Sequence, residues 1–345
     1  MSQTGQPQIL FPYEAPPAAG ETYEMAPGVW WVRLPLPLAL DHVNIWVLDD
    51  GDGWTIVDCG LATEDSIAIW AALASGPFAG KRFRRLIATH GHPDHIGAAR
   101  HLAQTFDLSL AATMVEWQTA VMRHGEMSGD ALPGQTRFLI EHGYPAEKAA
   151  RRSAFGKSIT AMMSAPPELD SSFSHGDVVR FGQRNWRIII AGGHAEAHAS
   201  FYCEEDHILI AGDQILPRIT PFVGVDWRTP EDDPLKTYLD SMAIFGELPV
   251  DTLVLPGHGL PFRGLPVRLG QMHKHHDVRL DSVIAGLDRP RHAFDIAGLL
   301  FPRAVGTGHE RMALSESIAH LHYLLSHGRV GRTRDGEGVL LFERG

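Results

Sequence analysis

Residues 89–95 read Thr-His-Gly-His-Pro-Asp-His and place four metal-ligand side chains close together: His90, His92, Asp94 and His95. The apolar residues 86–88 before them are typical of the end of a buried strand, and residues 96–102 after them are typical of a helix. The segment is therefore predicted to be a strand-to-helix loop, an element on which binding and catalytic residues gather. Imidazole and carboxylate groups are good ligands for zinc and related ions, and four of them can serve two adjacent ions.

Three further segments combine an apolar strand, a glycine and one ligand-type residue. They are residues 191–194, 208–213 and 253–258, which end at His194, Asp213 and His258. Glycine at these positions lets the backbones approach a shared point closely. A single histidine in a chain with 20 of them is ordinarily a solvated or hydrogen-bonded structural residue. The ordered set, however, favours a metal site over chance composition.

This ordered set resembles the metallo-β-lactamase superfamily over residues 28–262. The resemblance rests on five motifs in order: residues 55–60 (Thr-Ile-Val-Asp-Cys-Gly), the histidine cluster, and the segments that end at His194, Asp213 and His258. It implies an α/β (α+β) fold of four layers, αββα, in which two mixed sheets lie between two layers of helices and metals bind at one sheet edge. It also implies that Asp58 is the structural acid beneath the metal loop.

The resemblance further implies two divalent metal ions. Their expected ligands fall into three groups: His90, His92 and His194 at one ion, Asp94, His95 and His258 at the other, and Asp213 as the bridge between them. Zinc is the leading expectation, and ligands of only histidine and aspartate also suit iron or manganese.

Three differences from other members of the superfamily bear on function. Its members often read Gly-His-Thr-Pro-Gly-His, whereas residues 195–197 here are Ala-Glu-Ala, so His198 is expected to support the ligands rather than to bind metal. The antibiotic-hydrolysing members generally carry Cys or Ser at the position of Asp213, so β-lactamase activity is not expected. The iron flavoprotein branch has Glu at the position of His92 and is disfavoured as well.

The expected chemistry is hydrolysis by a hydroxide that bridges the two ions. Two divalent ions about 3.5–4 Å apart lower the pKa of a shared water toward neutrality and polarise the scissile carbonyl or phosphoryl oxygen. Asp94 is the catalytic candidate, because its carboxylate could position that hydroxide and carry a proton to the leaving group. Cys59 and Cys203 lie in apolar surroundings and are expected to be buried rather than catalytic.

The composition of the chain bears on its domain number, its partners and its location. The chain has 345 residues, of which 44% are hydrophobic, enough for a large core and more than one domain. Its formal charge of −11 disfavours an extended polyanionic partner such as nucleic acid. Two cysteines cannot form a disulfide framework. No secretory or membrane-spanning segment is recognisable, which favours a cytoplasmic location.

Three parts are expected from the Pro- and Gly-rich breaks: an irregular lead-in over residues 1–28, the catalytic domain over 29–264, and a C-terminal domain over 265–345. Residues 42–48 and 54–57 flank an Asp/Gly turn and predict a β-hairpin. Thr63 can cap a helix over residues 64–75.

Residues 114–163 carry helical patterning without strand alternation, which predicts a helical insertion between core strands that flank the site. The insertion is expected either to cover the mouth of the site as a lid or to serve as extra core or a dimer contact. Its Met and aromatic residues suit an adaptable apolar pocket wall. Arg218 lies in the loop after Asp213 and could bind a substrate carboxylate or phosphate, or form a surface ion pair. Asp41, His42 and Asn44 are expected to be structural.

The C-terminal part is expected to be a small winged-helix-like domain with helices over residues 265–287, 292–301 and 313–326 and strands over 328–334 and 339–342. This arrangement resembles the tail of β-lactamase-like endoribonucleases and of some thioesterase-like relatives. Residues 266–345 hold 11 Lys and Arg against 9 Asp and Glu, a balance of +2, whereas the rest of the chain carries −13. Nucleic-acid-reading modules usually carry a strong basic stripe, so packing or dimerisation is the expected role.

The sequence alone leaves three functions open. The preferred one is a binuclear hydrolase of a small carbonyl substrate, such as a thioester of the acyl-CoA or acylglutathione type, or a lactone. The second is a metal-dependent endoribonuclease, which the C-terminal domain favours and the negative charge opposes. The third is a sulfur dioxygenase with one iron, or a non-catalytic binding protein, against which the complete ligand set weighs. A homodimer is compatible with each function.

Overall fold

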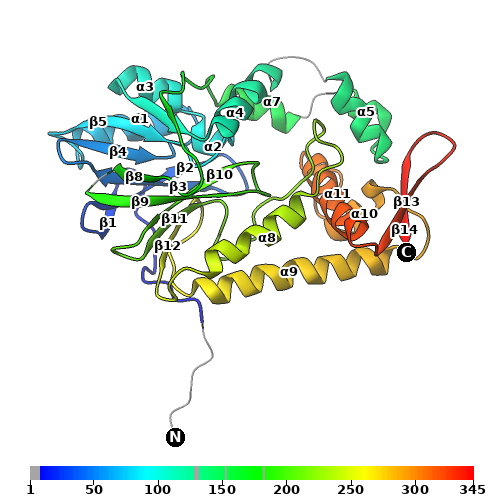
Figure 1. The fold of residues 1–345 in the computed structure, drawn as a ribbon. Helices are drawn as coiled ribbons and strands as arrows, with labels where there is room; N and C mark the ends of the chain where they lie inside the picture. Colours follow the sequence, from blue (N-terminus) through cyan, green and yellow to red (C-terminus); the bar gives the residue numbers. More distant parts are fainter. Residues whose placement is uncertain (1–7, 128–131, 152–153, 182) are drawn as a thin grey trace, which may run out of the picture.

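Two mixed β-sheets lie face to face, with helices on the outer side of each (Figure 1). This computed structural model describes residues 8–127, 132–151, 154–181 and 183–345. The arrangement confirms the four-layer αββα sandwich that the resemblance implies. Among the described residues, no helix is both long enough and apolar enough to span a membrane.

The first sheet follows the order of the chain. Its strands are β1 (Thr22–Ala26), β2 (Val29–Pro35), β3 (His42–Asp49), β4 (Gly53–Val57), β5 (Arg82–Ile87), β6 (Ser109–Ala112) and β7 (Ser171–Ser172). Strands β1 to β4 pair antiparallel, whereas β4 to β7 pair parallel. The antiparallel pair β3–β4 confirms the hairpin predicted around the Asp/Gly turn.

The second sheet has the order β12-β11-β10-β9-β8. Its strands are β8 (Val178–Phe181), β9 (Arg184–Ala191), β10 (His198–Cys203), β11 (Ile208–Gly212) and β12 (Leu253–Pro256). Strands β11 and β12 pair parallel, so both end at the same edge of the sheet. The residues that follow these two ends therefore lie close together.

Alternation along the central strands divides their side chains between two cores. In β3, Val43, Ile45 and Val47 pack with the outer helices, whereas Trp46 and Leu48 pack against the second sheet. This is the period of two expected of a strand that is buried on both faces. Each such side chain contributes about 1.5–3 kcal/mol through burial, so the sandwich holds the loops at its edge firmly.

Helices cover the sheets and connect them. They are α1 (Glu64–Ser75), α2 (Pro93–Ile96), α3 (Ala99–Phe106), α4 (Met114–Met127), α5 (Pro133–Glu141), α6 (Ala146–Ala149), α7 (Ala154–Ala161), α8 (Pro234–Gly246), α9 (Leu265–Gly286), α10 (Ala293–Leu300) and α11 (Glu310–Ser326). Helix α1 begins after Thr63, whose side chain accepts a hydrogen bond from Ser66 N, as predicted. Helices α4 to α7 confirm that the described part of the predicted insertion is helical.

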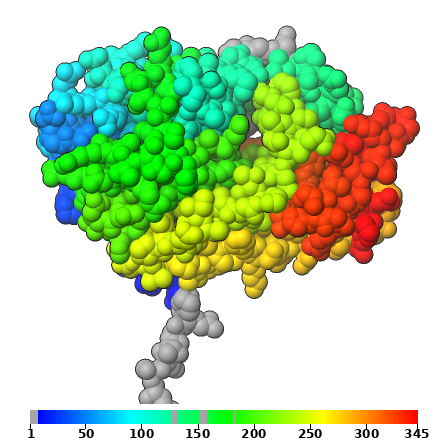
Figure 2. Space-filling view, in the orientation of Figure 1, coloured from blue at the N-terminus to red at the C-terminus, as the bar shows by residue number. Residues whose placement is uncertain are grey.

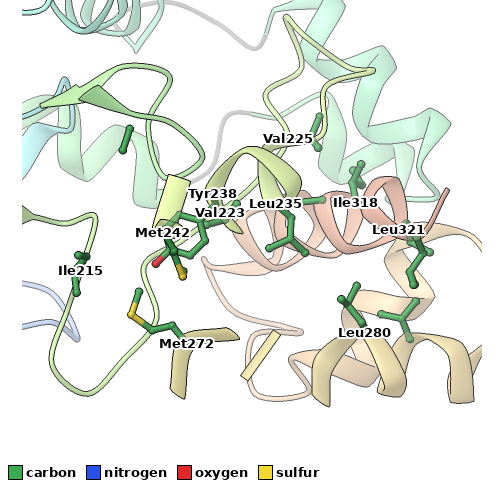
Figure 3. Close-up of a cluster of buried hydrophobic side chains, with 14 of the residues drawn as sticks. Ile215, Val223, Val225, Leu235, Tyr238, Met242, Met272, Leu280, Ile318 and Leu321 are labelled. Atoms are coloured by element: carbon green, nitrogen blue, oxygen red, sulfur yellow. The ribbon is translucent and has the colours of Figure 1, made fainter. Parts of the chain in front are cut away.

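The C-terminal segment has the three expected helices, α9 to α11, followed by a two-stranded sheet of β13 (Val330–Arg334) and β14 (Leu340–Arg344). Helix α9 runs from beneath the second sheet to these C-terminal elements (Figure 1). One hydrophobic cluster extends from Val254 of β12 through Tyr238 and Leu280 to Phe342 of β14. Figure 3 shows part of it, where Tyr238 and Met242 of α8 approach Met272 of α9. The core is thus continuous across the expected boundary at residue 264.

The N-terminal lead-in differs from the expectation of an irregular segment. Residues Thr22–Ala26 form β1, which pairs antiparallel with β2 across a tight turn in which Gly28 has φ 73°. Met25 is buried in the core between the sheets, and the ring of Tyr23 meets that of Trp31 edge-on. The Pro- and Gly-rich residues before Thr22 conceal this short strand, because its stability comes from pairing and packing rather than from a long apolar run.

Candidate metal centre

The seven candidate ligands converge at one end of the sandwich, where loops leave β5, β9, β11 and β12. Their ligand atoms form three overlapping groups, each within 4.8 Å: His90, His92 and His194; His90, His95 and Asp213; and Asp94, His95 and His258. Segments that are far apart along the chain thus supply one cluster. The structure brings together every residue that the resemblance assigned to metal.

The first group consists of three imidazoles. His90 Nε2 lies 2.9 Å from His92 Nδ1 and 3.2 Å from His194 Nε2. Burial is the largest cause that lowers the pKa of each of the three side chains, and neighbouring positive charge lowers the pKa of His90 and His92 further. The imidazoles are therefore neutral near pH 7, which is the form that binds metal.

The second group combines histidines with carboxylates. His258 Nε2 lies 3.3 Å from Asp94 Oδ2 and 3.2 Å from Asp213 Oδ2. Asp213 Oδ1 lies 3.4 Å from His95 Nε2, while its Oδ2 lies 3.7 Å from His194 Nε2. Burial lowers the pKa of His258, but the adjacent carboxylates outweigh burial and raise the pKa to about 10. Asp213 thus lies between the two groups, as a bridging residue would, and the carboxylates attract positive charge.

Hydrogen bonds behind the rings orient four of the histidines. In each, Nδ1 donates outward, so that Nε2 points into the cluster. The acceptors are Thr89 Oγ1 for His90 (3.0 Å), Asp58 Oδ2 for His95 (2.8 Å), the Phe222 carbonyl for His194 (2.7 Å) and the His42 carbonyl for His258 (2.6 Å). The Nε2 atoms of all four histidines therefore point into the cluster.

Asp58 is buried beneath the histidine loop and has φ 63°, in the left-handed region. Its Oδ1 accepts from Thr89 N at 2.8 Å, and its Oδ2 accepts from Thr89 Oγ1 at 2.9 Å and from His95 Nδ1 at 2.8 Å. The carboxylate thus ties the end of β4 to the start of the metal loop after β5. This is the structural position that the resemblance implies.

The residues of the cluster fit divalent ions. His95 Nε2 and Asp213 Oδ1 are buried and have no hydrogen-bond partner among the residues that the structure describes. Buried polar atoms are normally hydrogen-bonded, so two that face each other at 3.4 Å without a hydrogen bond suit a ligand between them. Gly257 has no room for a Cβ atom, which would collide with the Asp213 carboxylate and the His95 ring. The nitrogen and oxygen donors suit zinc, iron or manganese.

The supporting residues expected from the sequence also lie at this edge. His198 Nε2 accepts from Asp213 N at 3.1 Å, and burial lowers the pKa of His198 to about 3, so the ring stays neutral and orients Asp213. His42 holds the loop that carries His258, because its carbonyl accepts from that ring and its Nε2 accepts from Gly259 N at 2.8 Å. These contacts agree with a structural role.

Arg218 is exposed, and its guanidinium lies 5.2 Å from the ring centroid of Phe11. Among the described residues, Arg218 thus makes a cation–π contact rather than the surface ion pair that the sequence suggested. Its contact with a substrate carboxylate or phosphate stays a prediction.

Glu116 of α4 is a supporting residue that sequence reasoning missed. Its buried carboxylate accepts from Gly91 N through Oε2 and from Ala197 N through Oε1, each at 2.8 Å. One side chain therefore joins the two loops that carry the first group of histidines. Thr113 and Glu116 have the spacing of a capping box, but only Thr113 caps, accepting from Glu116 N at 3.3 Å.

Comparisons with known proteins agree with this geometry. Residues 38–258 match the family model described as the Metallo-beta-lactamase superfamily, and residues 280–345 match the one described as Metallo-beta-lactamase-like, C-terminal domain. Among curated proteins, the chain is similar to the probable metallo-hydrolase YqjP of Bacillus subtilis, with 26% identity over 317 residues that cover 85% of this chain and 91% of that protein.

Solved structures extend the similarity over the whole fold. A beta-lactamase domain protein from Burkholderia ambifaria is 34% identical, with a TM-score of 0.87 and coverage of 98% of this chain and 97% of that one. A metallo-beta-lactamase family protein from Thermus thermophilus is 26% identical, with a TM-score of 0.80 and coverage of 93% and 100%. Because the first family match spans most of the chain and contains every candidate ligand, this chain belongs to the metallo-beta-lactamase superfamily.

Proposed function

We propose that this protein is a metal-dependent hydrolase of a small carbonyl substrate, either a thioester of the acyl-CoA or acylglutathione type or a lactone. The observation that carries the proposal is the position of Asp213, whose carboxylate lies 3.7 Å from His194 Nε2 of the first group and 3.2 Å from His258 Nε2 of the second. A carboxylate placed between two sets of donors suits a pair of ions. The similarity to a protein named a probable metallo-hydrolase supports the reaction class.

Each side chain has a role that follows from its surroundings. Divalent ions, with zinc as the first expectation, would supply hydroxide at neutral pH and polarise the substrate oxygen. The side chain of Asp94 is 21% exposed, compared with 10% for Asp213, so Asp94 is the carboxylate that substrate and solvent reach more readily. Its Oδ2 can hold a proton and release it to the leaving group. Asp58 and Glu116 keep the loops in place while this happens.

Exposed apolar side chains on the insertion support an acyl substrate. Helix α4 starts at the metal loops, and it exposes Met114, Val121 and Met122 by 45%, 41% and 41%. Ile140 of α5 is 37% exposed. Large apolar side chains left exposed on an insertion beside a catalytic centre suit contact with a ligand, and methionine adapts to acyl groups of different shape.

The basic residues of the C-terminal sheet support a small substrate over RNA. Each of three arginines pairs with an acid: Arg329 with Asp281 (3.7 Å), Arg332 with Glu231 (2.8 Å) and Arg334 with Glu141 (3.3 Å). Their charge is thus largely compensated within the protein. An RNA-binding surface would instead present uncompensated arginines to phosphate.

The test is a substrate panel on the metal-reconstituted protein. We expect close to two divalent ions per chain by elemental analysis, and hydrolysis of an acyl-CoA, an acylglutathione or a lactone that a chelator abolishes and added metal restores. Cleavage of single-stranded RNA without hydrolysis of any carbonyl substrate would replace the proposal with an endoribonuclease. One iron per chain together with oxygen consumption would replace it with a sulfur dioxygenase.

A further inference from the structure

Arg123 lies on the face of α4 that packs on the metal loops. Glu116, Ala120 and Arg123 follow one another at intervals of four and three residues, which places them on one face of a helix. The first two pack on the loop that carries His90 and His92, because a Cβ atom on Gly91 would meet the backbone of both. Arg123, about one turn beyond Ala120, therefore extends over the same edge of the site.

A second segment lies beside Arg123. It is the loop of residues 222–228, which contains Asp226, 4.0 Å from Arg123 Nη2, and begins at Phe222, the residue whose carbonyl accepts from His194 Nδ1. The loop also touches α5, since a Cβ atom on Gly134 would meet the Trp227 ring. Figure 2 shows the surface hollowed between the blue-green helices of the insertion and this yellow-green loop. Arg123 and this loop therefore lie together, next to the segment that orients His194.

The two acids beside Arg123 are bound more closely by a different arginine. Arg228 Nη1 donates to Asp226 Oδ1 at 2.8 Å and to Asp226 Oδ2 at 3.0 Å, and Arg228 Nη2 pairs with Glu126. Its guanidinium also lies 4.4 Å from the centroid of the Trp227 ring. Arg123 Nη2, by contrast, is 4.0 Å from Asp226 Oδ2, at the outer limit of an ion pair, and its side chain is 33% exposed. Arg123 is therefore the arginine that can accept a carboxylate from solution.

We propose that Arg123 binds a carboxylate that the substrate carries a few bonds from its scissile carbonyl. The planar guanidinium matches a carboxylate with two parallel hydrogen bonds, and it remains charged at every relevant pH. The proposed substrate is therefore an ester or thioester of a dicarboxylic acid, whose free carboxylate binds Arg123. This inference rests on the proposed hydrolase function and narrows its substrate.

The test compares two chromogenic substrates that differ in one charge: the mono-4-nitrophenyl ester of glutaric acid and 4-nitrophenyl pentanoate. In the metal-reconstituted full chain, Arg123→Gln should raise KM for the glutarate ester about tenfold to a hundredfold, because a charge-assisted pair is lost. KM for the pentanoate ester and kcat for both should change little. For Arg123→Lys, KM for the glutarate ester should lie between the values for the wild type and Arg123→Gln, since lysine keeps the charge without the planar guanidinium. Arg137→Gln, on the exposed face of α5, is the charge-matched control and should behave as the wild type.

An equal rise in KM for the two esters, or no rise for either, would overturn the role of Arg123 while the hydrolase proposal stands. A second measurement does not depend on turnover. Calorimetric titration should show that glutarate binds the wild type and Arg137→Gln more tightly than pentanoate does, and that Arg123→Gln removes the difference. If no ester is cleaved but this binding difference is found, the inference survives and the proposed reaction fails. If glutarate and pentanoate bind the wild type equally, the inference fails.

Discussion

Asp58 shows how much one buried carboxylate can organise at the scale of a residue. It accepts hydrogen bonds from Thr89 N, Thr89 Oγ1 and His95 Nδ1, and it does so from a left-handed backbone conformation with φ 63°. Asparagine tolerates that conformation but cannot accept from all three donors with a charged carboxylate. A change from Asp to Asn therefore separates the effect of the hydrogen bonds from the effect of backbone strain.

Asp58→Asn should lower the free energy of unfolding by about 1.5–3 kcal/mol, because hydrogen bonds to a buried charged group are weakened. Denaturant titration of the purified variant measures this change. Asp107→Asn is a matched control, since Asp107 also has a left-handed φ of 56° but lies exposed at the end of α3. Similar losses in the two variants would mean that the hydrogen bonds of Asp58 contribute nothing beyond a local turn preference.

Mutation of Asp94 should distinguish a catalytic effect from an effect on the fold. Its Oδ2 lies 3.3 Å from His258 Nε2, and its side chain is the more exposed of the two carboxylates in the cluster. Asp94→Asn should keep the fold, because the residue lies outside the hydrophobic core, and should lower kcat about a hundredfold through loss of a proton carrier. Steady-state kinetics with metal content measured in parallel checks this. An unchanged kcat with two ions bound would exclude the proton-carrying role.

At the scale of elements, α9 and α11 enclose a cluster of polar side chains. Glu316 of α11 faces Arg279 of α9, with an Oε1–Nη1 distance of 4.0 Å, and its side chain is 13% exposed. Burial raises the pKa of Glu316 to about 7, although Arg279 opposes the shift. His276 and His320 lie beside them, and burial lowers the pKa of His276 to about 3 and that of His320 to about 4. The helix pair is thus sensitive to pH.

The raised pKa of Glu316 determines the sign of a stability change. The folded state binds the proton more tightly than the unfolded state, so this contribution to stability is complete below about pH 4.5 and is lost as the pH rises through about 7. Glu316→Gln cannot ionise, so its free energy of unfolding should exceed that of the wild type by about 1–3 kcal/mol at pH 8. The two proteins should differ little at pH 4. The buried histidines destabilise both proteins alike as the pH falls below about 6.5, so they cancel in the comparison.

Denaturant titrations at pH 4, 6 and 8 measure this difference, with Glu337→Gln in an exposed turn as the control. A variant that is less stable than the wild type at pH 8 would show that the ion pair with Arg279 outweighs the cost of burying the carboxylate.

At the scale of the whole molecule, the C-terminal segment is joined to the sandwich rather than attached as a separate module. Its core is continuous with that of the second sheet. Arg332 of β13 pairs with Glu231, which precedes α8, and Arg334 pairs with Glu141 of the insertion. A segment bound in this way to two parts of the catalytic fold suits packing or assembly.

Charge removal at Arg329, Arg332 and Arg334, each changed to Gln, should leave hydrolysis of a small thioester or lactone nearly unchanged. Exposed ion pairs contribute about 0–1 kcal/mol each, so stability should fall only slightly. Kinetic assays and RNA-binding titrations at several salt concentrations check both expectations. Salt-sensitive RNA binding that the triple change abolishes, with a slope that falls by about 0.7 for each lost phosphate contact, would favour the nuclease.

Much of the candidate site could be predicted because its information is local. Each ligand follows an apolar strand and lies beside or near a glycine, as in residues 253–258, so identity and order are visible in the sequence. The hairpin of β3 and β4 and the cap at Thr63 were likewise predictable from turn and capping chemistry. By contrast, β1 was not, because a short edge strand depends on its partner more than on its own residues.

The sequence by itself determined which residues could bind metal, since only their chemistry and order along the chain were needed. The tertiary structure alone decided that Glu116 joins two loops instead of completing a capping box, and that Arg123 of the insertion lies 4.0 Å from Asp226. Each of these depends on contacts between segments far apart in the chain. Such contacts arise when sheets and helices pack, and local periodicity carries no record of them.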